Sequence, residues 1–137
     1  MKTLPILVAI AGVMALSGCS SAQNEAPCKD FETTYNAVDL RDKLITVDSR
    51  GADYRPSLKK LADTAKAGAE KASGDVQTHL SAIVSQEAMY EKTATQSDLP
   101  YTFLDVRGML DKSRDNLVKG CKDSGYPIEL EPDYPVR

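Results

Sequence analysis

The side chains able to do chemistry in this sequence are few: three cysteines (Cys19, Cys28 and Cys121) and one histidine, His79. A Ser-His-Asp or Cys-His catalytic set would need His79 as its base, and the chain has no Gly-x-Ser-x-Gly sequence to hold a serine nucleophile. Asp75 precedes His79 by four residues, so an ion pair on one helical face accounts for the histidine without catalysis. We therefore expect no catalytic residues and no enzyme activity.

Metal ions and cofactors are not expected either. Two thiolates and one distant histidine fall short of a zinc ligand set. The chain also lacks the Glu-x-x-His repeats of di-metal bundles and the Cys-x-x-Cys-His sequence that attaches haem. A haem held by His79 with Met89 or Met109 is conceivable, but methionine at helical spacing is more often a core residue. Two acidic pairs lack the spacing of an EF-hand calcium loop and are expected to be solvated: Asp39 with Asp42, and Glu129 with Glu131.

Residues 1–18 have the order of parts of an export signal. Lys2 makes the start basic, and residues 4–16 form an apolar run that is too short to span a bilayer permanently. The run ends in the small residues Ser17 and Gly18, directly before Cys19. This arrangement predicts a secretory signal that is removed from the mature protein.

The Leu-Ser-Gly-Cys sequence of residues 16–19 resembles the lipobox of bacterial lipoproteins. The resemblance covers residues 1–19 only. It implies cleavage after Gly18 and a diacylglyceryl thioether on Cys19, with fatty acids such as palmitate. The protein would then be lipid-anchored to the cell membrane on its extracytoplasmic side. In a cell with two membranes, Ser20 is not the aspartate that marks inner-membrane retention, which implies the outer membrane, facing the periplasm.

Acylation of Cys19 would leave Cys28 and Cys121 as the remaining cysteines of an exported chain. Disulfides persist in exported proteins, and an even remainder is what one disulfide requires. The alternative is two separate buried thiols.

Length and charge limit the size of the domain and its partners. Removal of residues 1–18 from the 137-residue chain leaves 119 residues, enough for one core and not for two. Loss of Lys2 changes the formal net charge from −3 to −4, which disfavours a nucleic-acid partner and electrostatic attraction to a membrane. Sparse aromatic residues and a core of Leu, Val, Ile and Ala favour helices.

Apolar spacing and capping residues predict an all-α domain over residues 27–125. Residues 19–26 are expected to be the lipidated N-terminus and a flexible tether. Helices are expected over about 27–47, from 53–56 up to residue 73, over 76–92, and from an N-cap at Asp98 towards a C′ residue at Gly125, with Leu104 beside the buried face. The proline-rich tail, residues 126–137, alternates Ile128 and Leu130 with acids, so a short extended segment lying on the bundle is expected.

The stretch Ser73-Gly74-Asp75 leaves the number of helices open. Glycine, serine and aspartate favour a turn, yet the apolar period continues through them as in one kinked helix. Cys28 lies near the start of the first helix and Cys121 near the end of the last. In an up-down bundle those ends meet when the number of helices is even. A disulfide therefore favours four helices over three helices with a long middle one.

These features predict a small, disulfide-bonded helical bundle on a lipid anchor. The function expected first is non-catalytic, namely contact of the helical domain or its tail with an envelope protein or the cell wall. The alternative is a lipoprotein that holds a small apolar ligand between its helices, which would require a closed apolar cavity.

Overall fold

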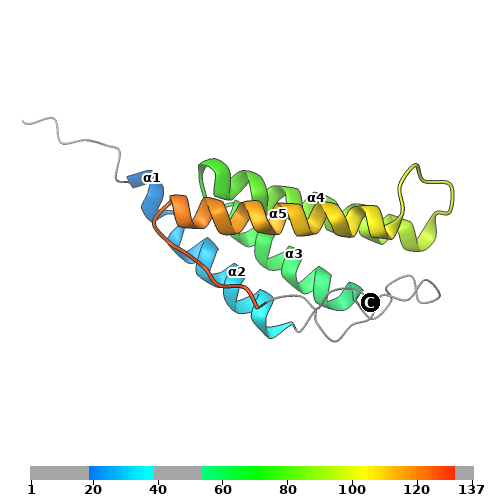
Figure 1. The fold of residues 1–137 in the computed structure, drawn as a ribbon, viewed down its shortest axis with the longest axis horizontal. Coiled ribbons are helices and arrows are strands. Elements are labelled where there is room, and N and C mark those ends of the chain that lie inside the picture. Colours follow the sequence, from blue (N-terminus) through cyan, green and yellow to red (C-terminus); the bar gives the residue numbers. More distant parts are fainter. Residues whose placement is uncertain (1–18, 39–53, 132–137) are drawn as a thin grey trace, which may run out of the picture.

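The computed structural model describes residues 19–38 and 54–131 of the chain. These residues form the short helix α1 (Cys19–Ala22) and four longer helices: α2 (Glu25–Ala37), α3 (Arg55–Ala69), α4 (Gly74–Thr95) and α5 (Phe103–Asp123). The four long helices alternate in direction and form a bundle, and the described part of the chain contains no strand (Figure 1). The prediction of a small all-α bundle is confirmed.

The core consists of apolar side chains that recur every three or four residues on the inward faces of the helices. Phe31 of α2, Leu58 of α3, Ile83 of α4 and Leu117 of α5 are all nearly inaccessible to solvent. This spacing places one apolar stripe on each helix, and burial of that stripe is what makes helices of this length stable. Close packing joins α2 to α3, α3 to α4, and α4 to α5.

The stretch Ser73-Gly74-Asp75 is a turn and not a kink. The backbone of Ser73 is extended, with φ −136° and ψ 161°, and Gly74 follows with φ +61°. Helix α3 has already ended at Ala69, and the left-handed φ at the first residue of α4 turns the chain without the steric cost that a side chain would add. The four-helix alternative is therefore confirmed, and the long middle helix is not formed.

The last helix begins later than expected. We predicted its N-cap at Asp98, but Thr102 caps α5: its side chain accepts a hydrogen bond from the Asp105 backbone N–H, and Asp105 accepts one from the Thr102 backbone in return. This reciprocal capping box satisfies two backbone donors at once. Leu104, expected beside the buried face, has 51% of its surface exposed.

The start of the domain also differs from the expectation. Residues 19–22 are helical, and α2 begins at Glu25, two residues before the predicted start at Pro27. The predicted helix over 27–47 is described as far as Val38, and its remainder lies outside the described residues, as do the signal segment and residues 132–137.

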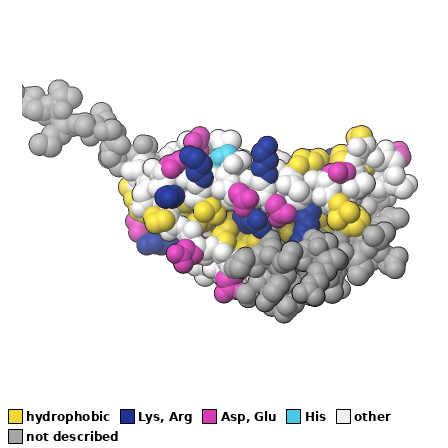
Figure 2. All heavy atoms as spheres, viewed as in Figure 1, with side chains coloured by type: hydrophobic (Ala, Val, Ile, Leu, Met, Phe, Trp, Pro, Cys, Tyr) yellow, Lys and Arg dark blue, Asp and Glu magenta, His cyan; other side chains and the backbone are white. Residues whose placement is uncertain are grey.

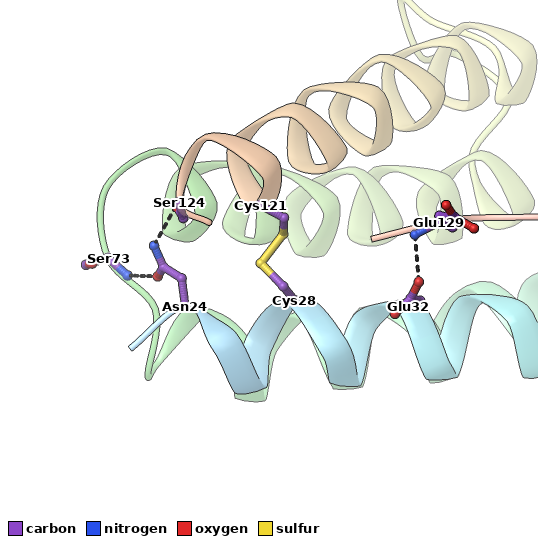
Figure 3. Close-up of a disulfide and its surroundings, with 7 residues drawn as sticks. All are labelled: Asn24, Cys28, Glu32, Ser73, Cys121, Ser124 and Glu129. Carbon is purple, nitrogen blue, oxygen red and sulfur yellow. Dashed lines mark hydrogen bonds between the residues drawn. A yellow bond between two sulfur atoms is a disulfide. The ribbon is translucent and has the colours of Figure 1, made fainter. Parts of the chain in front are cut away.

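The tail packs on the bundle, as expected for its first half. Ile128 is buried, and side chains of α2 bind the tail backbone directly after it. Asn36 donates from Nδ2 to the carbonyl of Glu129 (3.0 Å) and accepts from the N–H of Glu131 (2.9 Å). Glu32 accepts from the N–H of Glu129 (2.6 Å; Figure 3). The tail thus lies along α2 as an extended strap.

Cys28 and Cys121 form a disulfide that joins the first turns of α2 to the last turn of α5 (Figure 3). Their Cα atoms are 5.9 Å apart, and both residues are fully buried. The predicted pairing is confirmed.

We predict that reduction of this disulfide destabilises the domain strongly. The bond links residues 93 apart in sequence, and release of so long a loop costs about 4–5 kcal/mol in the chain-entropy model. The melting temperature followed by circular dichroism should fall by roughly 10 °C or more on reduction. A Cys28→Ala/Cys121→Ala variant should melt at the lower temperature with or without reductant. Equal melting of oxidised and fully reduced wild type would contradict the prediction.

A second prediction concerns the α3–α4 turn. A Cβ atom added at Gly74 or at Gly108 would meet no atom within 4 Å, but only Gly74 has a left-handed φ. Gly74→Ala should therefore lower the free energy of unfolding by about 1 kcal/mol. Gly108→Ala, inside α5, should raise it by up to about 1 kcal/mol. Urea denaturation of both variants measures the two effects, and a stabilising Gly74→Ala would be inconsistent with the turn.

Candidate functional site

The predicted disulfide residues, Cys28 and Cys121, lie at the same end of the bundle as α1, which begins at Cys19. Three segments meet there: the junction of α1 and α2, the α3–α4 turn and the end of α5 (Figure 1). The disulfide joins α2 to α5 beside them (Figure 3). We call this end the proximal pole and define it by Asn24, Ser73, Gly74, Ser124 and Gly125. The opposite end, which carries the α4–α5 loop of residues 96–102, is the distal pole.

Asn24 ties the N-terminal segment to the proximal pole. Only 4% of its surface is exposed. Its Oδ1 accepts a hydrogen bond from the backbone N–H of Ser73 (2.9 Å), and its Nδ2 donates to Oγ of Ser124 (3.1 Å; Figure 3). Both polar atoms of the buried amide are thus bonded to segments 49 and 100 residues away.

Local sequence explains why the Asn24 side chain is available for these contacts. Asn24 occupies the N-cap position of α2, and its carbonyl accepts from the Cys28 N–H (3.0 Å). Its side chain makes no capping hydrogen bond and turns to the neighbouring segments. At the pole's other segment, Gly125 follows the end of α5. Its φ of +90° lets the Tyr126 N–H return to the Cys121 carbonyl (2.9 Å). This confirms Gly125 as the C′ residue.

Charged side chains surround the pole as exposed pairs within single helices. Lys119 contacts Asp123 on α5, and this hydrogen bond, with the charges of Asp123 and Asp75, raises the pKa of Lys119. These groups are solvated, and exposed pairs of this kind contribute little to stability. The pole is therefore polar and of mixed charge.

The other candidate residues do not converge on a site. His79 lies half-buried on α4, and Met89 and Met109 pack against the core. Within the described residues, no group of three His, Cys, Asp or Glu side chains is placed to hold a metal ion. Glu129 and Glu131 are exposed on the tail, whereas Asp39 and Asp42 lie outside the described residues.

A small cavity opens between the aromatic rings of Phe31, Tyr35 and Tyr54, with Arg114 at its edge. Its volume of about 20 Å³ is about the room that one water molecule needs. Arg114 donates to the Tyr35 hydroxyl (3.0 Å) and to Asp111 (3.3 Å). A cavity of this size does not favour the predicted alternative of a ligand held between the helices.

Asn24 is the residue that sequence reasoning missed. It lies in a run of small and polar residues, Ser-Ser-Ala-Gln-Asn-Glu-Ala, whose composition is typical of a flexible tether. Its partners are distant in sequence, so no local pattern marks it.

The described residues include no helix with the length and apolarity needed to cross a membrane.

We predict that Asn24→Ala lowers the free energy of unfolding by about 1–3 kcal/mol, because it removes both hydrogen bonds of the buried amide and leaves the half-buried Ser73 N–H without this acceptor. Asn116→Ala is the matched control, since Asn116 is exposed on α5 and should change stability by less than about 0.5 kcal/mol. Amide exchange at Ser73 should also accelerate in Asn24→Ala alone. Equal effects of the two substitutions would show that Asn24 does not hold the pole together.

Comparisons with protein-family models, with curated proteins and with solved structures find no match for this chain. The function must therefore be inferred from the N-terminal residues of the chain and from the geometry of the bundle.

Proposed function

We propose that this protein is a lipoprotein of a bacterial cell envelope, anchored through Cys19, whose helical domain is non-catalytic and works by contact with an envelope protein or the cell wall. The observation that carries the proposal is the Leu-Ser-Gly-Cys sequence of residues 16–19 behind a basic start and an apolar run. In a cell with two membranes, Ser20 favours the outer membrane, facing the periplasm.

The disulfide supports export of the domain. Cys28 and Cys121 are bonded and fully buried, and structural disulfides are common in exported proteins and rare in the cytosol. A protein made with an export signal and stabilised by a buried disulfide fits the extracytoplasmic side of a membrane.

The surface of the domain supports a role in binding rather than in chemistry. The space between Phe31, Tyr35 and Tyr54 has room for about one water molecule. Larger hollows of the described surface, of about 480 and 490 Å³, are open grooves lined mostly by charged and polar side chains such as Lys60, Asp63 and Glu87. Open polar grooves suit contact with another macromolecule better than the enclosure of a small apolar ligand. An acidic mature chain has no general attraction for anionic lipids, which leaves the proposed acyl chains to hold it. Two or more such chains are what stable anchoring requires.

We predict that Cys19→Ala abolishes lipid attachment and the membrane retention that depends on it. The variant lacks the thiol that would carry the diacylglyceryl group, so the protein should appear in the soluble fraction or remain as an uncleaved precursor. Cell fractionation and intact mass measurement distinguish these outcomes from the wild type, which should carry the mass of the lipid. Ser20→Ala retains the thiol and should stay membrane-bound. Normal processing and retention of Cys19→Ala would refute the anchor.

A further inference from the structure

The described bundle is an elongated body with its N-terminal attachment at one end (Figure 1). Helices α2 and α4 begin at the proximal pole, and α3 and α5 end there. The 21 residues of α5 span about 30 Å at 1.5 Å per residue. The distal pole therefore lies about 30 Å from the proximal pole.

The link between Cys19 and the bundle is short because Asn24 is fixed. Asn24 lies five positions after Cys19 in the sequence, which makes five residue-to-residue steps. Even fully extended they reach roughly 17 Å, and a helical path such as that of α1 shortens the reach to about 8 Å. Cys28, four residues further on, is bonded to α5. The first residue of the mature chain cannot move far from the proximal pole.

The described flank that Figure 2 shows carries charges of both signs. Lysine, arginine and acidic side chains alternate over this visible face (Figure 2), and the mature chain is acidic overall, which gives it no general attraction to anionic lipids. Leu104 is the only large apolar side chain among the described residues that is strongly exposed, and it lies in the first turn of α5, at the distal pole.

We propose that the bundle stands on the bilayer by its proximal pole, with Ser73 and Ser124 facing the lipid headgroups and the α4–α5 loop about 30 Å further out. This inference rests on the proposed lipid anchor at Cys19. It makes the polar proximal pole a headgroup-facing surface. A partner then meets the flanks and the distal pole, where Leu104 is exposed.

Energy transfer to a headgroup-labelled lipid tests this orientation. The lipidated full-length protein is reconstituted in vesicles of phosphatidylethanolamine and phosphatidylglycerol, with a donor dye on one introduced cysteine. Lys71→Cys, Lys112→Cys and Ser97→Cys place the dye at exposed positions near the proximal pole, at mid-height on α5 and in the distal loop. We expect transfer to decline in that order, with a distance difference of about 30 Å between positions 71 and 97.

Two controls separate the orientation from the anchor. Cys19→Ala should show no transfer at any position. A Gly-Ser-Gly-Ser-Gly-Ser insertion between Ala22 and Gln23 should keep the protein on the vesicles but shrink the gradient. Equal transfer at positions 71 and 97 in vesicle-bound wild type, or a reversed gradient, would overturn the orientation while leaving the anchor intact. Absence of vesicle binding by the wild type would overturn both.

Discussion

Close helix packing in this domain follows the chain from α2 to α3, α4 and α5, but it does not join α2 to α5 to the same extent. That seam of the bundle is closed by other means. The Cys28–Cys121 bond closes it near the proximal pole, and the tail runs along α2 with Ile128 buried. The covalent bond is the constraint on which the rest depends, because it holds the first and last helices together where their own packing is weakest.

Helix α2 shows why this closure matters. It has 13 residues, a length at which an isolated helix is marginal in water, and it packs closely on α3 alone. The disulfide near its start, and Glu32 and Asn36 bound to the tail further along, supply contacts on its other side. The same side chains satisfy backbone groups of the tail that the extended conformation would leave without partners. Disulfide, strap and helix therefore stabilise one another.

Features with a local cause were predictable from the sequence. The Ser73-Gly74-Asp75 turn follows from glycine's tolerance of a left-handed φ, and Gly125 marks the end of α5 for the same reason. The pairing of Cys28 with Cys121 followed from assigning Cys19 to the lipid, and that pairing in turn favoured an even number of helices. These inferences need only the residue types and their order.

Features that depend on distant partners were not predictable. Asn24 reads as part of a tether because Ser73 and Ser124 are far from it in sequence. The start of α5, expected at Asp98, differs for a local reason: the Thr102–Asp105 capping box satisfies two backbone donors where Asp98 would satisfy one. Leu104 lies on the same helix as buried residues such as Val106, yet 51% of its own surface is exposed.

The closures are distributed unevenly along the bundle, and this has a mechanical consequence. The disulfide and the Asn24 hydrogen bonds all lie at or beside the proximal pole, so that end is tied together across sequence separations of up to 100 residues. The α4–α5 loop at the distal pole lacks such a link among the described residues. Towards the distal pole the helices are joined by ring contacts instead: the Tyr54 ring lies 5.6 Å from that of Tyr90, and the Arg107 guanidinium lies 5.7 Å from the Tyr54 ring. Local opening has a low free energy where long-range ties are few, so we expect the α4–α5 loop beyond these rings to open more readily than the proximal pole. With the proposed lipid on Cys19, such a domain would hold its position at the membrane through the firmly tied proximal pole, while the loop at its outer end adjusts to the surface it meets.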